Sequence, residues 1–280
     1  KIGLVGLSII LLFGAMSLAH PLLMRWAWDP RVYDPIVGFG FDEPLHPAPP
    51  SLRHPLGTDP LGRDLLSQLM FSARSEFLLG VVAALVTVFI ATLIGGVTAY
   101  YGGWVDALFM RLANLIMMLP GISLLIVIGA MYKLGLLELA LVIGLLSGFG
   151  GTTIILKAQA LSVRVKPFIE AARGAGGSDF YIVRSHIIPH LLPLAFLYMM
   201  FTVTGAIFSE AVLSFFGLLD VRMSWGIMIH TAQVGGYLLG GPQYWWLVVP
   251  AGVSITLLCG AFYLVGRALD EVVNPRLRKR

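Results

Sequence analysis

The sequence is poor in charged residues and in cysteine. Only 12% of its 280 residues are Asp, Glu, Lys or Arg, roughly half the fraction of a typical soluble globular domain, whereas 58% are hydrophobic. So little charge excludes a surface that is solvated mainly by water, and it favours a chain that lies in a lipid bilayer. The one cysteine, Cys259, excludes an internal disulfide, and we interpret it as a small packing residue.

Long runs without any charged residue are abundant. A helix that crosses the hydrocarbon core needs about 20 apolar residues. The sequence predicts six such spans, within residues 2–19, 77–105, 112–132, 139–156, 187–209 and 245–266. A cleaved signal peptide is the alternative for residues 1–20, but the absence of a small-residue cleavage site favours a retained helix. The expected fold class is an all-α membrane protein with six transmembrane helices.

The positive charges are distributed unequally between the two sides of this topology. Six spans place both termini on the same side, and twelve of the 19 Lys and Arg residues then lie on that side. The positive-inside rule assigns this side to the cytoplasm, and the closing NPRLRKR at 274–280 strengthens the assignment. The net charge of +4 is explained by this topology. We therefore expect membrane lipid as a partner and no nucleic acid.

Two features precede the second span. Nine of the 16 prolines lie within residues 20–60, which predicts a packed, non-helical extracytoplasmic loop. In HPLGTDPLGRDLLSQLMFSAR, residues 54–74, Asp59 is expected to cap a helix that begins at Pro60, with apolar side chains at helical spacing. This pattern predicts an amphipathic helix on the membrane surface.

These features divide the chain into two parts. Residues 1–76 would hold the first transmembrane helix, the proline-rich loop and the amphipathic helix. Residues 77–280 would form a core of five transmembrane helices with a cytoplasmic loop at residues 157–190. The sequence SGFGGTT at 147–153, in the fourth span, predicts close approach of another helix because its residues are small.

The cytoplasmic loop contains the most informative stretch, EAARGAGGSDFYIVRSHIIP at residues 170–189. Pro167 suits a helix start, and Gly176 suits a turn that ends this helix. The residues predicted to share one nearly flat face of the first helix are Phe168, Ala171, Ala172 and Ala175. Ser178 is expected to cap a second short helix that ends at Pro189. The pattern predicts two helices joined by a glycine hinge, a ridge that suits a groove on a partner. A basic loop that serves only topology is the alternative.

This stretch resembles the EAA loop of binding-protein-dependent ABC importer permeases. The residues that match the motif are Glu170, Ala171, Ala172, Gly176 and Pro189, whereas His186 and Ile188 stand where Ile and Leu are usual. The stretch at 54–74, SEAVLSFFGL at 209–218 and SWGIM at 224–228 are similar to the second-permease subfamily for dipeptides, oligopeptides and nickel.

The resemblance implies a type I ABC importer permease in the cell membrane of a prokaryote. Its EAA loop would dock as a coupling helix in a cleft of a cytoplasmic ATPase. The coupling residues implied in this way are Glu170, Ala171, Ala172, Gly176, Asp179 and Pro189. The implied partners are a second homologous permease, one or two ATPase subunits and an extracytoplasmic solute-binding protein. The implied cargo is a di- or oligopeptide, with nickel or another small solute as the alternative.

The chain offers no candidate site for catalysis or for a metal. GFGGTTIILK at 148–157 fails the G-x-x-x-x-G-K-[ST] spacing of a phosphate loop and lies in a predicted span. His186 and His190 are four residues apart but have no third ligand nearby. We therefore expect a chain that is not an enzyme and that carries no cofactor, with ATP and Mg²⁺ bound by the partner ATPases.

Two residues in the predicted spans are candidates for a gate or a pathway. Glu210 lies near the outer end of the fifth span, and a carboxylate within a membrane is functional by default. It would stabilise the outer gate or contact the partner permease, whereas a position among the headgroups or a hydrogen bond to a neighbouring helix is the structural alternative. Pro120, followed by Gly121, predicts a kink in the third span.

Two other classes of protein remain as alternatives. A secondary transporter driven by an ion gradient would be expected to have paired carboxylates within the membrane and often inverted repeats. The sequence shows one marginal carboxylate, Glu210, and no repeat. A purely scaffolding membrane subunit is the second alternative, and it would tolerate changes at Pro120 or Glu210 without loss of transport.

Overall fold

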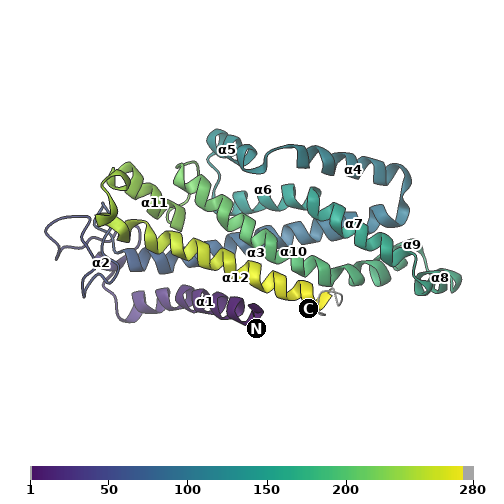
Figure 1. The fold of residues 1–280 in the computed structure, drawn as a ribbon, viewed down its shortest axis with the longest axis horizontal. Coiled ribbons are helices and arrows are strands. Elements are labelled where there is room, and N and C mark those ends of the chain that lie inside the picture. The colour runs from purple at the N-terminus through teal and green to yellow at the C-terminus, as the bar shows by residue number, and fades with distance from the viewer. Residues whose placement is uncertain (1, 274–280) are drawn as a thin grey trace.

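A computed structural model describes residues 2–273, and the regular elements of that range are helices (Figure 1). The four longest are α1 (Ile2–Trp26), α3 (Leu65–Tyr101), α10 (Ile188–Phe215) and α12 (Val249–Val273). The shorter helices of the membrane region are α4 (Gly103–Met118), α5 (Gly121–Tyr132), α6 (Leu136–Phe149) and α7 (Gly151–Arg164). The remaining α-helices are α2 (Pro30–Tyr33), α8 (Pro167–Gly174), α9 (Asp179–Ile182) and α11 (Trp225–Val234). The all-α class predicted from the sequence is confirmed.

The number of spans depends on two bent pairs of helices. Four continuous helices are long and apolar enough to cross a membrane, and the pairs α4–α5 and α6–α7 would raise the number to six. The second pair bends by 41° at Gly150, and the first bends by 82° at Pro120. Pro120 breaks the chain because the residue before a proline is pushed out of the α region, and Leu119 accordingly has an extended ψ of 131°. The predicted kink is therefore a complete break between two helices.

The prediction of an amphipathic helix within residues 54–74 is wrong in two respects. The helix starts later than predicted, and it is part of a long helix rather than a separate one on the membrane surface. Asp59 accepts the backbone N–H groups of Leu61 and Arg63 and so closes a turn, in which Gly62 has a φ of +79°. The helix begins only at Leu65, capped by Asp64, and it continues without interruption to Tyr101. A division of the chain between residues 76 and 77 therefore falls inside α3.

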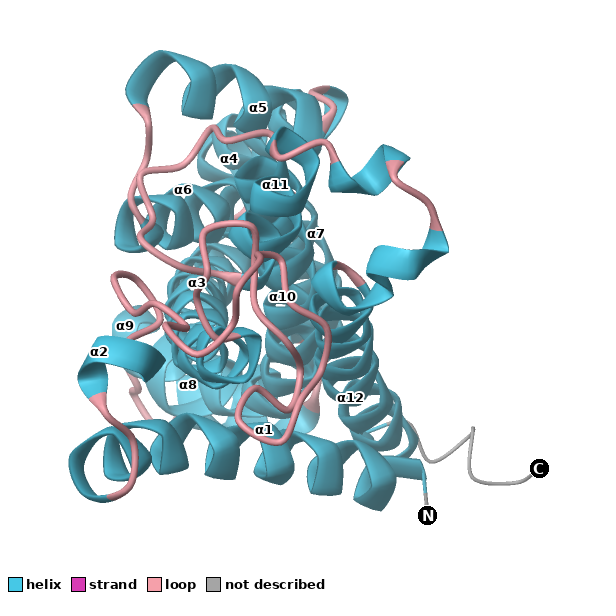
Figure 2. Cartoon of the chain, turned by 90° about the vertical axis from the view of Figure 1, so that its left-hand side faces the viewer, coloured by secondary structure: helices cyan, strands magenta, loops and turns pink. Residues whose placement is uncertain are grey.

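The proline-rich loop between α1 and α3, which we call the outer loop after the topology predicted from the sequence, is irregular and packed, as its prolines predict, apart from the short α2. Figure 2 looks at this end of the molecule and shows the loop in front of the helix ends. His54 and Asp64 are buried within the loop, and His54 Nδ1 lies 2.8 Å from Asp64 Oδ2. Asp64 Oδ1 accepts the backbone N–H of Ser67 at 2.7 Å. Burial raises the pKa of the Asp64 carboxyl, and the contacts with Ser67 and His54 oppose that rise.

Replacing Asp64 by alanine is expected to destabilise the outer end of the molecule by about 2 kcal/mol or more. The change removes the N-cap of α3 and leaves the buried ring of His54 without its partner, and each loss costs about 1 kcal/mol or more. The thermal unfolding midpoint of the purified protein measures the effect. Asp64→Asn keeps an acceptor for the Ser67 N–H and should lose less. Equal midpoints for the wild type and the alanine variant would contradict this role.

Helix α3 is the central element of the bundle, and α1, α6, α7 and α10 pack around it. Helix α6 approaches α3 closely because two residues of α6 at their contact are glycines. A Cβ at Gly144 would lie 2.6 Å from Val86 Cβ, and one at Gly148 would lie 3.0 Å from Ile90 Cβ. Thr87 adds a hydrogen bond of 3.3 Å to the Gly144 carbonyl. The small residues of the fourth span therefore serve close helix packing, as predicted.

The long helices reach beyond the thickness of a bilayer. With 37 residues, α3 is about 55 Å long at 1.5 Å per residue, whereas the hydrocarbon core is about 30 Å thick. Helices α1 and α12 lie along only part of this length, with Gly3 against Ala268. At the far end from the outer loop, α3 and α10 extend past them and carry α8 and α9 (Figure 1). The bundle thus carries a small helical unit at the end opposite the outer loop.

Candidate functional site

The segment at this far end is a hairpin of two short helices, Pro167–Ile182, which we call the coupling hairpin. Helix α8 ends at Gly174, and Gly176 has a φ of +85°. The N–H of Gly177 bonds to the Ala172 carbonyl at 3.0 Å and the N–H of Gly176 bonds to the Arg173 carbonyl at 3.0 Å, which is a Schellman motif. Ser178 then caps α9. The predicted pair of helices with a glycine hinge is confirmed.

The predicted end of the second helix at Pro189 is wrong. A single π-helical turn, Val183–Ile187, joins α9 directly to α10, so that residues 179–215 form one continuous helix. Pro189 has no N–H to donate, and a turn with wider hydrogen bonding just before it lets the helix continue. The second helix of the coupling hairpin is therefore the start of the long helix at residues 179–215 rather than a separate element.

The hairpin is anchored to the end of α3. Ile169 and Ile182 are buried in a cluster with Ala99 of α3 and Leu191 of α10. The hydroxyl of Tyr100 donates to Asp179 Oδ1 at 2.5 Å. Asp179, placed by the sequence among the coupling residues, thus binds α3 through Tyr100.

Arg173 joins the same contact from α8. Its guanidinium lies over the Tyr100 ring, 5.7 Å from the centroid, and donates to the Tyr100 hydroxyl at 3.3 Å. This hydrogen bond raises the pKa of the Arg173 guanidinium. Tyr100 thus joins Asp179 at the start of α9 and Arg173 of α8 to the end of α3.

The flat face predicted on α8 is partly buried against the bundle and partly exposed. Phe168 and Ala172 pack inward against the buried cluster, whereas Ala171 and Ala175 are exposed. Glu170 is also exposed. Phe168 and Ala172 pack against the same cluster that buries Ile169, so these three residues mark the inward side of α8.

The exposed surface of the hairpin includes two aromatic residues that the sequence reading missed. Phe180 is 69% exposed and Tyr181 is 51% exposed, in the part of the chain that extends past the ends of α1 and α12. Large apolar side chains that are exposed to water mark an interaction surface. Both residues follow shortly after the Ser178 cap in an otherwise charged loop, and this position in the sequence could have identified them.

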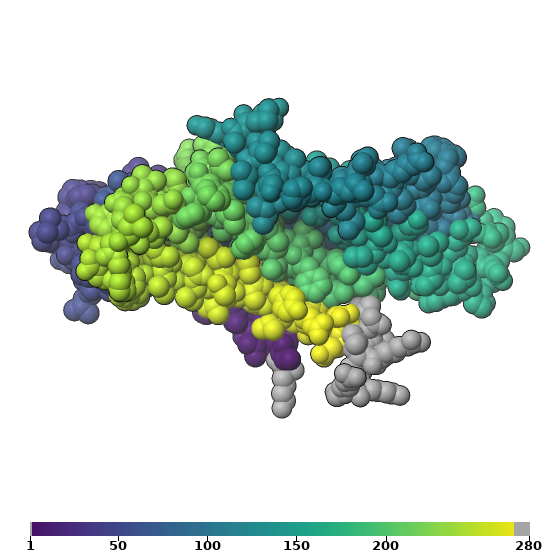
Figure 3. All heavy atoms as spheres, turned by 45° about the horizontal axis from the view of Figure 1, so that its top comes forward, coloured from purple at the N-terminus to yellow at the C-terminus, as the bar shows by residue number. Residues whose placement is uncertain are grey.

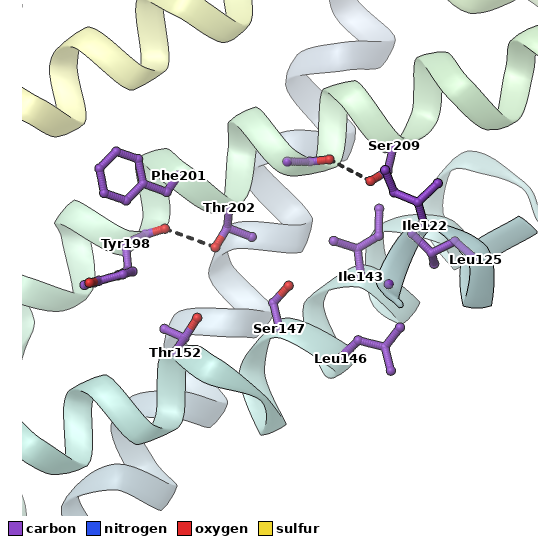
Figure 4. A pocket seen from close by; sticks show the side chains of 12 residues that line it. Ile122, Leu125, Ile143, Leu146, Ser147, Thr152, Tyr198, Phe201, Thr202 and Ser209 are labelled. Carbon is purple, nitrogen blue, oxygen red and sulfur yellow. Dashed lines mark hydrogen bonds between the residues drawn. The ribbon is translucent and has the colours of Figure 1, made fainter. Parts of the chain in front are cut away.

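A second feature is a pocket of about 340 Å³ between α5, α6, α7 and α10. Its wall contains hydroxyl groups, of which those of Thr202 and Ser209 donate to the carbonyls of Tyr198 and Gly205 within α10. Figure 4 shows Ser147 and Thr152 with their oxygens toward α10, which carries Thr202 and Ser209. Gly121, next to Pro120, forms part of the wall. The helix break at Pro120 thus positions α5 against this pocket.

Helices α4 and α5 form a ridge along one side of the molecule, seen in teal in Figure 3. An ion pair between Lys157 of α7 and Asp106 of α4 ties the ridge to the bundle. Met117 and Met118, at the end of α4, are 59% and 78% exposed. Adaptable methionine side chains beside a hydroxyl-lined pocket suit a surface that meets different ligands or a second chain.

Glu210 is enclosed by the chain and is not exposed to headgroups. It is 0% exposed and accepts a hydrogen bond of 2.5 Å from Ser214 Oγ. Glu76 of α3 is equally buried and faces it. The sequence reading missed Glu76, although its spacing from Leu69 and Ala73 places it on the buried face of α3. The paired carboxylates that a secondary transporter would need are therefore present, enclosed by the chain's own helices.

Apolar helices long enough to cross a membrane, a pocket between them and a helical hairpin at one end of the bundle place this chain in the class of multi-pass membrane proteins. The chain belongs to the family of binding-protein-dependent transport system inner membrane components, whose family model matches residues 88–279. The match confirms the importer-permease resemblance.

Individual relatives agree over most of the chain. The dipeptide transport system permease protein DppC of Bacillus subtilis (strain 168) is 31% identical over 100% of this chain and 83% of its own length. The oligopeptide transport system permease protein OppC of Lactococcus lactis subsp. cremoris (strain SK11) is 33% identical over 83% of this chain and 79% of its own. OppC of Mycobacterium bovis is 28% identical over 97% of this chain and 89% of its own.

Proposed function

We propose that this chain forms one half of the membrane pathway of an ATP-driven importer of di- or oligopeptides. The observation that carries the proposal is the coupling hairpin, which is anchored to α3 and α10 and exposes Glu170, Ala171 and Phe180 beyond the bilayer. A cytoplasmic ATPase subunit binds this surface. The hairpin end of the molecule and both chain termini then face the cytoplasm, in agreement with the positive-inside distribution.

The remaining partners follow from the incomplete pocket. One chain supplies only one wall of a path, through α5, α6, α7 and α10, and a second homologous permease closes it. An extracytoplasmic binding protein delivers the ligand to the packed outer loop. Peptide is favoured as the cargo because relatives that cover most of this chain carry dipeptide and oligopeptide transport in their names.

The mechanism assigned to this chain is that of a rigid lever. The partner ATPases bind ATP and Mg²⁺ and act on the hairpin, and Tyr100, Asp179 and Arg173 pass the displacement to α3. Because α9 and α10 are one helix, the same displacement reaches the pocket wall at Tyr198 and Thr202. ATP changes the outcome only by favouring one global state of the assembly over the other.

The proposal is tested by purifying the tagged chain from its native membrane in mild detergent and identifying what accompanies it. The expected companions are an ATPase and a second six-span permease. Cells that lack the chain should lose uptake of labelled di- and oligopeptides and regain it on complementation. Normal peptide uptake with lost nickel uptake would reassign the cargo. A chain that is isolated alone, and that transports in liposomes under an ion gradient, would overturn the proposal in favour of a secondary transporter.

A further inference from the structure

The pair formed by Glu76 and Glu210 is the most unusual arrangement within the bundle. The two carboxyl groups come from α3 and α10, are both 0% exposed, and lie within hydrogen-bonding reach of each other. Carboxylates are almost never fully buried unless they are paired with another group. Here the facing group is a second carboxyl. If both carboxyl groups were ionised, the two anions would repel each other.

The surroundings offer few donors to the two carboxyl groups. Ser214 Oγ donates to Glu210 Oε1, and Ser224 Oγ donates in turn to Ser214 Oγ at 3.2 Å. Within residues 2–273, no side-chain donor satisfies either oxygen of Glu76 or the second oxygen of Glu210, and the backbone group placed toward Glu76 is the N–H of Trp225 at the start of α11. Two buried carboxylates with so few donors would be costly, since each unsatisfied buried group costs about 1–3 kcal/mol.

No cation of the described chain compensates the two charges. None of the ion pairs within residues 2–273 includes Glu76 or Glu210. Arg74 precedes Glu76 by two residues on α3 and is exposed, on the other side of that helix. From α12 the titratable neighbour is Cys259, whose thiol is directed at the Thr204 carbonyl at 3.6 Å. A proton held by the pair itself would remove one of the two charges and supply a donor between the two carboxyl groups.

We propose that Glu76 and Glu210 share a single proton and that the resulting hydrogen bond holds the outer half of α3 against α10. The proton resides on Glu76, which has no side-chain donor, and Glu76 donates to Glu210 Oε2. The remaining charge resides on Glu210, where Ser214 already donates. Ser224 is the N-cap of α11, so the chain of hydrogen bonds joins three helices. The proton is enclosed and stays in place during transport, unlike the exchangeable proton of a secondary transporter.

The purified assembly in nanodiscs tests this proposal through two variants compared with the wild type. The wild type should show an infrared band of a protonated carboxyl at neutral pH, and that band should be missing from E76Q. Because the side-chain amide introduced by E76Q still donates to Glu210, this assembly should keep its thermal midpoint and its uptake close to wild type. E76A leaves Glu210 buried without that donor and should lower the midpoint by about 5 °C or more.

The pH dependence gives an independent readout. The folded wild type retains a proton that the unfolded chain releases at neutral pH, so its midpoint should fall as the pH is raised. E76Q has no such proton and should show a weaker fall over the same range. Identical infrared spectra and pH profiles for the wild type and E76Q would overturn the shared proton. A wild-type midpoint that rises with sodium chloride but not with choline chloride would overturn it in favour of a bound sodium ion.

Discussion

Replacing Gly176 by valine should strongly reduce coupled uptake while the protein still inserts and assembles. Gly176 has a φ of +85° at the turn of the coupling hairpin, and a side chain there would meet no atom within 4 Å. The effect is therefore backbone strain alone, about 1–2 kcal/mol for a residue with a Cβ in the left-handed region. Because about 1.4 kcal/mol is a factor of ten in an equilibrium, we expect peptide uptake to fall about tenfold or more. ATP hydrolysis should continue without uptake.

Gly174 provides a matched control two residues earlier. A Cβ at Gly174 also meets nothing within 4 Å, but its backbone is helical rather than left-handed. Gly174→Val should therefore leave uptake close to wild type. Uptake and membrane insertion are measured in the same cells for both variants. Normal uptake by Gly176→Val, at normal membrane levels, would show that the geometry of this turn is not needed for coupling.

Filling the hydroxyl-lined pocket should block transport without disturbing the fold. Gly205 of α10 lies in the wall of the pocket, and an added Cβ would meet nothing within 4 Å. A phenylalanine at this position would place its ring in a space of about 340 Å³. We expect the rate of peptide uptake to fall about tenfold or more, because a path that is narrowed by a ring cannot admit a peptide side chain. Membrane levels and co-purified partners should be unchanged.

Gly260 of α12 serves as the control for that change. It also has open space at its Cβ, and it does not form part of the pocket wall. Gly260→Phe should leave uptake within about twofold of wild type, as a surface change that touches no buried group usually does. If Gly205→Phe transported peptide as well as Gly260→Phe, the pocket would not lie on the translocation path.

The sequence predicted those elements that depend on local chemistry. The coupling hairpin followed from Pro167, Gly176 and Ser178, since a helix start, a left-handed turn and a cap are each decided by one residue and its neighbours. The break at Pro120 followed for the same reason. The angle of that break did not, because a proline interrupts a helix without setting the direction of the next one, which depends on packing against α6 and α10.

Tertiary packing decided the features that the sequence could not give. Asp59 and Asp64 are both able to cap a helix, and only the buried partner His54 selects Asp64. Glu76 and Glu210 are 134 positions apart in the sequence, and no local pattern shows that α3 and α10 bring them together. The exposure of Phe180 depends on how α9 leaves the bundle. The candidate coupling residues were thus located from motif spacing, whereas the buried carboxyl pair required the structure.

Cross-linking at the tip of the coupling hairpin tests the docking of an ATPase most directly. Cys259 is the only cysteine of the chain, so Cys259→Ala gives a background in which Ala175→Cys is the single thiol. With a thiol-reactive cross-linker, this exposed position should form a product with a partner that carries an ATP-binding loop, in an amount that changes with ATP. A thiol at Leu52, in the outer loop, should give no such product. A cross-link to the ATPase from Leu52→Cys, or none from Ala175→Cys in an assembly that contains the ATPase, would contradict docking at the hairpin.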